Sequence, residues 1–425
     1  MGNFMGSIIF KSVTIIDGDF CQQNRMYVGI NGRNIDYIGT EYKSGYEREY
    51  DGAGKCLIPA FYNAHAHSPM SLLRGYAENM CLNDWLFNKI FPFEATLGEE
   101  DIYQSMLLSF AEMLSFGCVS ATDMYYMGEA MSRAVLDSGV KSNISLAATV
   151  YNAERLKKEY VSLIENCRGI NDRLRIDISV HASYTSSPEV VRIFSDMAVE
   201  YGCNMHLHLS ETESENNECK VKYALTPTEY FEKHGAFRVP TTAAHCVFLE
   251  NGDIDILKKH GVTVASCPTS NLKLASGICD VIRLLDNNIS VAIGTDSVAS
   301  NNNLDMFGDM KLFSLLPKGI KRDPTLITPA QCLYSATRAG ALSQGRADCG
   351  SIAVGNRADI AVIDLDRPHL TPVHDMLNTL VYSANGSDVV MTISDGRVLY
   401  ENGEFTTIDI EKVKAYARKR IGEEK

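Results

Sequence analysis

The chain has 425 residues, of which 45% are hydrophobic, and a formal net charge of −13 at pH 7. At roughly 100 to 200 residues per domain, this length gives two or three domains, although barrel folds exceed that size as single domains. The acidic balance, without any Lys/Arg run, argues against nucleic acid or an anionic membrane as a partner. A soluble enzyme that acts on a small molecule fits better.

The first residues, MGNFMGSIIF, lack the basic head and the apolar stretch of a secretory signal. No run reaches the roughly 18 apolar residues that a membrane-spanning helix needs. The twelve cysteines are scattered, and Cys118, Cys246 and Cys267 fall inside apolar, strand-like segments. We therefore predict a cytoplasmic protein with reduced thiols.

Residues 7–56 consist of short alternating segments separated by Gly and Asp turns, and residues 352–410 repeat this texture. Both stretches predict antiparallel strands. Neither stretch is long enough for a stable sandwich alone, so we expect them to combine. The predicted organisation is a small β-sandwich built from residues 1–56 and 351–425, with a C-terminal helix, around a central domain of residues 57–350.

Eight apolar, strand-like runs alternate with helical patterns between residues 57 and 330. Glu99–Phe116 and Pro188–Tyr201 show helical spacing, and Ser187-Pro188 is typical of a helix start. The alternation favours an α/β fold, a distorted (β/α)8 barrel of the TIM type, over an open doubly wound sheet. The predicted strands are Leu57–Ala64, Cys118–Met124, Asn143–Val150, Ile176–Val180, Asn204–Leu209, Thr241–Val247, Val262–Cys267 and Ser290–Ile293.

Histidines gather at the ends of these runs. His65-Ala66-His67 places two imidazoles on one side of a strand, because side chains alternate along it. His208 and Asp296 lie at the ends of two later runs. Neutral imidazoles with a carboxylate suit Zn²⁺ or Fe²⁺, and a catalytic site keeps one position open for water. We predict His65, His67, His208 and Asp296 as ligands of one divalent metal, Zn²⁺ being expected and Fe²⁺ the alternative.

Three more residues are predicted to work beside this metal. Glu211 lies three residues after His208, and a carboxylate next to activated water can take its proton and pass it to a substrate ring nitrogen. His245 would orient the water, and Asp296 would accept its proton as well as bind metal. His181 would contact the substrate.

Simpler interpretations exist for these residues. His-x-His also occurs in ordinary strands, and the prediction depends on the later segments that accompany it. Glu211 could cap the following helix or belong to a solvated acidic loop. His206 shares a strand face with His208, but we interpret it as a structural residue or one that supports a metal ligand, because the His-x-x-Glu spacing begins at His208.

Five segments carry a resemblance to a known family. The segments are Ala60–Gly75, Met205–Thr212, Ala243–Val247, Cys267–Gly277 and Gly294–Leu304. Together they resemble the amidohydrolase superfamily, in particular its mononuclear aminohydrolase branch of 5-methylthioadenosine/S-adenosylhomocysteine deaminases and chlorohydrolase-like proteins. The resemblance spans nearly the whole chain and implies a distorted (β/α)8 barrel with a β-sandwich from both termini. It also implies the metal ligands given above, with Glu211 and His245 as catalytic partners.

The resemblance further implies how many metals and which substrate the site takes. Binuclear branches of the superfamily carry a metal-bridging lysine where this chain has His181, so one metal is expected. A Trp-Leu segment followed by Pro-x-Glu packs around the nucleoside in these deaminases, which points to Trp85 and Glu94 as substrate-binding residues. The alternative is that Trp85 is a core residue and Glu94 an acid at a helix start.

One family feature is missing. The family places an arginine after the third strand, where this chain has Ala148–Asn152. The resemblance matches a second family arginine to Arg155, which we therefore predict to bind the substrate. Losing one cation weakens recognition of a carboxylate tail. Adenosine, 5'-deoxyadenosine and 5'-methylthioadenosine are therefore favoured over S-adenosylhomocysteine.

The predicted function is hydrolytic deamination of adenine nucleosides, giving the inosine analogue and ammonia. The alternative is an aminohydrolase or chlorohydrolase of another nitrogen heterocycle, such as a triazine, guanine or a pyrimidine. From a different class, a non-catalytic assembly protein could share the fold. The predicted partners are a purine nucleoside and, in a homo-oligomer, further copies of the chain.

Overall fold

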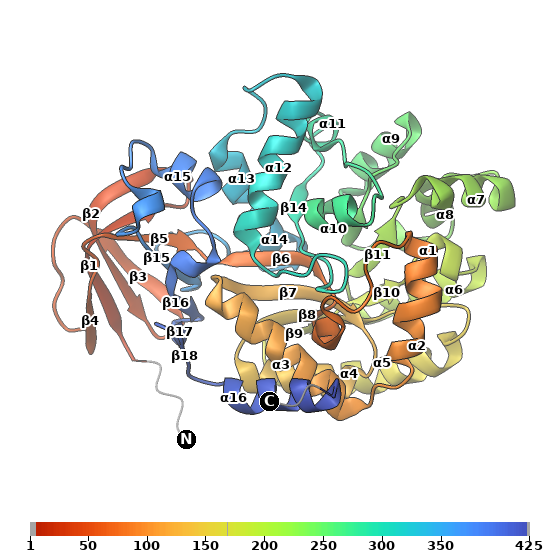
Figure 1. Cartoon of the computed structure of the whole chain (residues 1–425), viewed down its shortest axis with the longest axis horizontal. Helices are drawn as coiled ribbons and strands as arrows, with labels where there is room; N and C mark the ends of the chain where they lie inside the picture. The colour runs from red at the N-terminus through yellow and green to blue at the C-terminus, as the bar shows by residue number, and fades with distance from the viewer. Residues whose placement is uncertain (1–5, 168, 423–425) are drawn as a thin grey trace.

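Strands from both ends of the chain meet in one sheet. The computed structural model describes residues 6–167 and 169–422, and it contains a nine-stranded sheet at one side of the molecule (Figure 1). Its strands are β1 (Ile8–Ile16), β2 (Gln22–Asn31), β3 (Asn34–Gly39), β4 (Arg48–Asp51), β5 (Lys55–Pro59), β15 (Ile360–Asp364), β16 (Val389–Ser394), β17 (Arg397–Glu401) and β18 (Glu404–Phe405). β5 pairs antiparallel with β15 and parallel with β1, which joins the two ends of the chain.

Two parallel sheets lie beside the nine-stranded sheet. One consists of β6 (Phe61–Ala66), β7 (Cys118–Tyr125), β8 (Lys141–Leu146) and β9 (Leu174–Ile176). The other consists of β10 (Ile178–Val180), β11 (Met205–Leu209), β12 (Thr241–His245), β13 (Thr263–Ser266) and β14 (Val291–Ile293). Isolated parallel bridges, Ala66 to Asp296 and Ala148 to Val180, connect the edges of these two sheets. The α/β class with parallel strands is therefore confirmed.

Helices follow most of the parallel strands (Figure 1). The predicted start of one of them is confirmed, because Ser187 Oγ accepts a hydrogen bond from the Val190 N–H and Pro188 occupies the first helical position. The α-helices are α1 (Leu82–Trp85), α2 (Phe91–Glu94), α3 (Glu99–Ser115), α4 (Gly128–Ser138), α5 (Ala153–Cys167), α6 (Pro188–Tyr201), α7 (Glu213–Tyr223), α8 (Pro227–Lys233), α9 (Asn251–His260), α10 (Pro268–Lys273), α11 (Val281–Asp286), α12 (Met306–Lys321), α13 (Pro329–Ala336), α14 (Arg338–Ser343), α15 (Met376–Tyr382) and α16 (Ile410–Arg420).

Two predicted strands are each divided in the structure. The run Leu57–Ala64 belongs partly to β5, in the nine-stranded sheet, and partly to β6, in a parallel sheet, with Ala60 between them. Both strands are fully buried along this run, so apolar periodicity gave no sign of the change of sheet. The run Ile176–Val180 is divided at Asp177, whose buried carboxylate accepts hydrogen bonds from Asn143 Nδ2.

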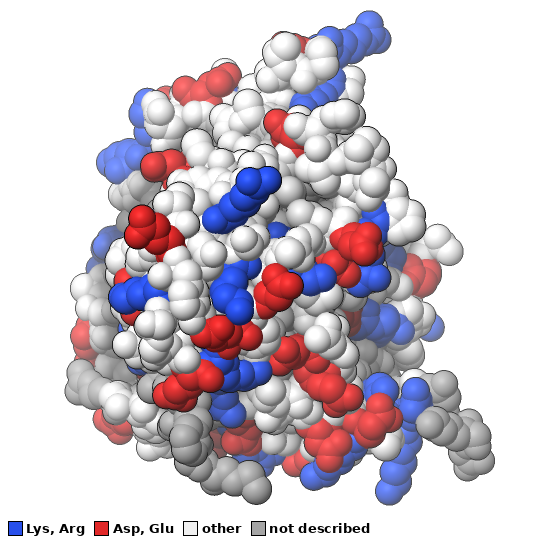
Figure 2. Space-filling model, turned by 90° about the vertical axis from the view of Figure 1, so that its left-hand side faces the viewer, with Lys and Arg blue, Asp and Glu red and all other residues white. Residues whose placement is uncertain are grey.

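The outer face of the nine-stranded sheet mixes charges of both signs. Figure 2 shows acidic and basic side chains interspersed over the side of the molecule where β1 to β4 lie. Within the described ranges, no helix has the length and apolar character required to cross a bilayer. All twelve cysteines lie within the described ranges, and each is present as a free thiol.

A buried cluster of charges ties the nine-stranded sheet to the parallel strands. Lys141, the first residue of β8, contacts the Asp359 carboxylate and lies 3.1 Å from Asp395 Oδ1. Arg33 and Arg173 also pair with Asp395, at 2.7 and 3.0 Å. Lys141, Asp359 and Asp395 are at most 2% exposed, so each charge depends on its partners rather than on water.

We expect Lys141→Met to destabilise the protein strongly, because Asp359 and Asp395 would stay buried with less compensation. Removing one partner of a buried pair costs about 3 to 5 kcal/mol. Lys55→Met is the matched control, since Lys55 pairs with Asp364 between β5 and β15 but its side chain is 31% exposed. The control should cost under about 1 kcal/mol. Urea unfolding at pH 7 measures both, and equal losses would contradict the role given to the buried cluster.

Candidate metal centre and active site

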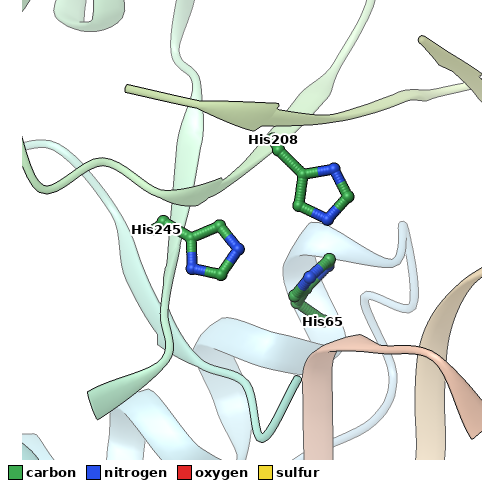
Figure 3. A group of neighbouring side chains, drawn as sticks. All are labelled: His65, His208 and His245. Atoms are coloured by element: carbon green, nitrogen blue, oxygen red, sulfur yellow. The ribbon is translucent and has the colours of Figure 1, made fainter. Parts of the chain in front are cut away.

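Histidines from three strands meet at the carboxyl ends of the parallel sheets. Two groups have possible ligand atoms that lie within 4.8 Å of one another: His65, His208 and His245, and His65, His67 and Asp296. Figure 3 shows the rings of His65, His208 and His245 directed toward one shared space. The structure therefore brings all four predicted metal ligands, and His245, into one cluster.

The local backbone explains how β6 and β14 come close enough to form this cluster. The Asp296 N–H donates to the His65 carbonyl at 2.9 Å. A Cβ atom on Gly294 would lie 2.9 Å from the His65 backbone nitrogen, so this position requires glycine. Asp296 and His245 both adopt positive φ, +60° and +73°, which costs free energy in residues that have a Cβ. Such strain is typical of functional positions.

Main-chain carbonyls fix the orientation of two imidazoles. His67 Nδ1 lies 2.5 Å from the Met124 carbonyl oxygen, and His208 Nδ1 lies 2.7 Å from that of His181. A carbonyl only accepts hydrogen bonds, so each Nδ1 carries the proton and each neutral ring has its lone pair on Nε2. The two Nε2 atoms are 3.3 Å apart.

A divalent cation fits this donor set. Two tetrahedral nitrogen ligands at about 2.1 Å from a metal lie roughly 3.4 Å apart, close to the observed Nε2 separation. His67 Nε2 lies 3.2 Å from Asp296 Oδ1, and His65 Nε2 lies 3.5 Å from the same oxygen. His65 Nε2 is also buried without a hydrogen-bond partner among the described residues. A cation would satisfy these atoms together.

The ionisation states also suit a metal. Burial lowers the pKa of His65 to about 4 and lowers the pKa of His208 well below its usual value. Burial raises the pKa of Asp296, but the neighbouring His65 and His67 imidazoles outweigh it and hold the pKa well below its usual range. Burial lowers the pKa of His67, but Asp296 outweighs this and raises it. Neutral His65 and His208 and an ionised Asp296 are the forms that bind Zn²⁺ or Fe²⁺.

Glu211 lies between β11 and α7, next to His245. Its Oε2 is 3.8 Å from His245 Nε2, and its side chain is buried. Burial raises the pKa of Glu211. The backbone N–H of Glu211 donates to Glu215 Oε2 at 2.8 Å, and Ser183 Oγ donates to Glu215 Oε1 at 2.8 Å. The structure thus places the predicted proton shuttle in a fixed loop beside the cluster.

A pocket opens directly onto the cluster. It encloses about 570 Å³, including the space at its mouth. Five of its residues belong to the predicted catalytic and substrate-binding set outside the metal ligands: Trp85, Glu94, His181, Glu211 and His245. The remaining walls are largely apolar or aromatic: Met70, Leu82, Leu86, Ile90, Phe91, Met124, Tyr125, Tyr126, Ala147, Tyr184 and Leu274.

Three predicted substrate-binding residues have well-defined surroundings. Trp85 is buried, and its Nε1–H donates to the Ala77 carbonyl at 3.2 Å. Burial raises the pKa of Glu94 to about 7. Burial also lowers the pKa of His181 to about 3, and its Nδ1 lies 2.9 Å from Thr185 Oγ1.

Arg155 does not lie in this pocket. It stands on α5, where its side chain is 59% exposed and pairs with Glu159 at 2.8 Å. It lines a neighbouring space of about 1030 Å³ that shares Phe91, Glu94 and Tyr126 with the first pocket. The two spaces therefore adjoin along Glu94.

Several residues that support the site were not predicted from the sequence. His206 is not among them, since the sequence predicts a structural or ligand-supporting role for it, and its Nε2 lies 2.9 Å from His65 Nδ1. Five supporting residues were not predicted. Ser270 and Ser300 each donate a hydrogen bond to Asp296, and Ser276 donates one to Glu211. Asn271 pairs with His245, and Glu215 accepts from the Glu211 backbone N–H. The Cys267–Gly277 segment carried part of the family resemblance, but its spacing did not indicate which side chains would reach the cluster.

Comparison with known proteins places this arrangement in a class. Residues 56–399 match the amidohydrolase family. Fold and site together define an α/β enzyme with a histidine and aspartate cluster at its strand ends. The chain belongs to the amidohydrolase family, which confirms the resemblance seen in the sequence.

Individual relatives are similar over nearly their whole length. The chain is 40% identical over 399 residues, 91% of its length and 92% of the relative's, to the 5-methylthioadenosine/S-adenosylhomocysteine deaminase of Acetivibrio thermocellus. It is 38% identical over 409 residues, 95% of each chain, to the 5'-deoxyadenosine deaminase of Methanothermobacter thermautotrophicus. A solved structure of an adenosine deaminase from Xanthomonas campestris with bound zinc is similar with a TM-score of 0.93, at 27% identity and 98% coverage of both chains.

Glu94 should make the stability of the protein fall as pH rises. Its pKa of about 7 lies above the ordinary value of about 4.3, so the folded state binds more protons than the unfolded state between these two values. The stabilisation is complete below the unfolded pKa and is lost as pH rises through 7. We expect Glu94→Gln to gain roughly 1 to 3 °C in Tm relative to the unsubstituted protein between pH 5 and pH 8.

Glu78→Gln is the control for this measurement. Lys273 lowers the pKa of Glu78, so its substitution should produce no such gain. Thermal unfolding at pH 5 and at pH 8 measures the Tm of both variants. An equal change in Tm for Glu94→Gln and Glu78→Gln would contradict the raised pKa assigned to Glu94.

Proposed function

We propose that the protein is a metal-dependent hydrolytic deaminase of adenine nucleosides. The observation that carries the proposal is the position of Glu211, buried beside His245 in a pocket that opens onto paired histidine lone pairs. The relatives named as deaminases of 5-methylthioadenosine, S-adenosylhomocysteine and 5'-deoxyadenosine support it. We assign His65, His67, His208 and Asp296 as ligands of one divalent metal, with Zn²⁺ expected and Fe²⁺ the alternative.

The residues divide the chemistry among themselves. A divalent metal at this site supplies the Lewis acidity that makes water a nucleophile near neutral pH. Glu211 takes a proton from the water and delivers it to the purine ring nitrogen, because its raised pKa suits a group that must both accept and donate. His245 orients the attacking water, and Asp296 receives the second proton of the water and passes it to the departing amino group. Water adds at the carbon that bears the amino group, and ammonia leaves.

The pocket suits a nucleoside. Trp85 and the surrounding aromatic residues supply apolar surface for a purine, and Glu94 supplies acceptors for the ribose hydroxyls. His181, held neutral by burial, contacts the purine. Glu211 contacts the ring nitrogen of the purine that it protonates.

The neighbouring space argues for substrates without a charged tail. Arg155 is paired with Glu159, and this pairing leaves less of its charge for a carboxylate. Glu94 lies on the shared wall, where its ionised form adds negative charge as pH rises through about 7. Adenosine, 5'-deoxyadenosine and 5'-methylthioadenosine therefore fit better than S-adenosylhomocysteine.

We also propose the finer organisation of the fold. The two bridges between the parallel sheets support a closed, distorted (β/α)8 barrel over residues 57–350. A separate apolar core, with Val13, Val28, Leu57 and Ile360 among its members, supports a β-sandwich built from residues 1–56 and 351–425. The C-terminal helix of the second part is α16.

The metal-loaded protein should release ammonia from adenosine, 5'-deoxyadenosine and 5'-methylthioadenosine, with the ultraviolet change of adenine to hypoxanthine. Glu211→Gln should lower kcat by about 10² to 10⁴-fold, because it removes the proton carrier, while metal content stays at one ion per chain. Glu218→Gln, an exposed change in the same acidic segment, is the matched control and should leave kcat unchanged. Chelation of the metal should abolish turnover.

Guanine and a triazine are included as competing substrates. Turnover of either one, with none of any adenine nucleoside, would overturn the proposal and leave a metal-dependent hydrolase of another ring. No turnover and no bound metal would favour the non-catalytic class.

A comparison of substrates with and without a carboxylate tail tests the role proposed for Arg155. We expect kcat/KM for 5'-methylthioadenosine to exceed that for S-adenosylhomocysteine by about tenfold, since one charge-assisted contact contributes roughly 1.4 kcal/mol or more. Glu159→Gln should narrow the gap, because it frees the Arg155 guanidinium for the carboxylate. Equal kcat/KM values for the two substrates in the unsubstituted enzyme would show that the tail is recognised by other groups.

A further inference from the structure

One short segment reaches three of the groups that handle protons. It begins after β13 at Cys267, continues through α10 and ends at Gly277. Ser270 Oγ donates to Asp296 Oδ2 at 2.6 Å, and Ser276 Oγ donates to Glu211 Oε1 at 3.1 Å. Asn271 Oδ1 lies 2.8 Å from His245 Nδ1. The three contacts reach residues at or just beyond the ends of three other strands, β11, β12 and β14.

The segment is fixed tightly enough to orient these side chains. Ser270, Asn271 and Ser276 are 0%, 1% and 4% exposed. The backbone N–H of Ser276 donates to the Asn271 carbonyl at 2.8 Å, which folds the chain back after α10. Gly277 has φ of +126°, and a Cβ there would lie 2.8 Å from Val247 Cγ1, so the turn requires glycine.

Asn271 decides which nitrogen of His245 carries the proton. With the amide oxygen facing Nδ1, His245 donates from Nδ1–H, and the unprotonated Nε2 is the atom that lies 3.8 Å from Glu211 Oε2. Loss of this acceptor would allow the proton to move to Nε2, which would then present a donor instead of a lone pair.

Ser276 fixes the orientation of the Glu211 carboxylate, which is the group that faces His245. Its hydroxyl occupies Glu211 Oε1, which leaves Oε2 as the oxygen that faces His245. The carboxylate therefore has one anchored oxygen and one oxygen directed toward the cluster.

We propose that the Cys267–Gly277 segment is a positioning element, in which Asn271 sets the tautomer of His245 and Ser276 sets the orientation of the Glu211 carboxylate. Ser270 holds Asp296 in the same way. The inference rests on the proposed function, since the roles of His245 and Glu211 are defined there. Asn271 and Ser276 act through these residues and are not themselves catalytic.

Kinetics of paired variants tests the proposal. Asn271→Leu keeps the size of the side chain but removes the acceptor, and should lower kcat by about 10- to 100-fold with little change in KM, as supporting hydrogen bonds of this kind do. Asn271→Asp retains an acceptor oxygen and should recover most of the loss. Ser276→Ala should lower kcat by about tenfold. Leu272→Ala is the control, since Leu272 also lies on α10 but is 40% exposed, and its kcat should equal that of the unsubstituted enzyme.

A second readout does not depend on turnover. Nitrogen-15 spectra of the zinc-loaded protein with labelled histidine, assigned with His245→Asn, should show His245 protonated on Nδ1, and the Asn271→Leu spectrum should shift toward the other tautomer. An Nε2–H tautomer in the unsubstituted protein, or equal kcat losses in Asn271→Leu and Asn271→Asp, would overturn the inference. If the expected tautomer is found but no nucleoside is deaminated, the proposed function fails and the positioning of His245 by Asn271 stands.

Discussion

The site depends on two hydrogen bonds from imidazole N–H groups to main-chain carbonyls. His67 and His208 each give their Nδ1 proton to the backbone, at Met124 and His181. Those carbonyls lie at or just beyond the ends of β7 and β10, so strand packing itself sets where the Nε2 lone pairs point. Backbone carbonyls in packed strands move little, which gives a metal site its precision without further side chains. The 3.3 Å separation of the two Nε2 atoms follows from this arrangement.

Burial also shifts the pKa values of the titratable groups that line the pocket. It raises the pKa of the Glu94 and Glu211 carboxyls and lowers the pKa of His181 and His208, since a charged form is disfavoured away from water. The pKa of Asp296 shifts in the opposite direction, because the neighbouring imidazoles outweigh the effect of its burial. The same buried surroundings thus separate one carboxylate that is ionised in the resting site, Asp296, from two carboxyl groups whose pKa is raised, Glu94 and Glu211. This separation is what acid–base chemistry beside a metal requires.

The sequence predicted the parts of this arrangement that depend on local pattern. Histidines at the ends of apolar runs indicated a cluster because parallel strands bring their carboxyl ends together. The division at Ala60 was missed because burial on every side leaves no periodicity to mark where one sheet ends. Asn271 and Ser276 were missed for another reason. Their partners His245 and Glu211 are distant in the chain, and nothing in the spacing of a polar helix and turn specifies such contacts.

Stability and chemistry depend on opposite ends of the parallel strands. Lys141 begins β8 and lies in the charge cluster beneath the nine-stranded sheet, whereas His208 and His245 lie at or near the carboxyl ends of β11 and β12. In parallel sheets, ligands bind beyond the carboxyl ends, so the amino ends are free to be locked by buried ion pairs. The positive φ values of His245 and Asp296 persist because local contacts fix the backbone there, as in the hydrogen bond from the Asp296 N–H to the His65 carbonyl. The charge cluster and the nine-stranded sheet therefore stabilise the amino end of β8, and they leave the carboxyl ends of the parallel strands open for the site.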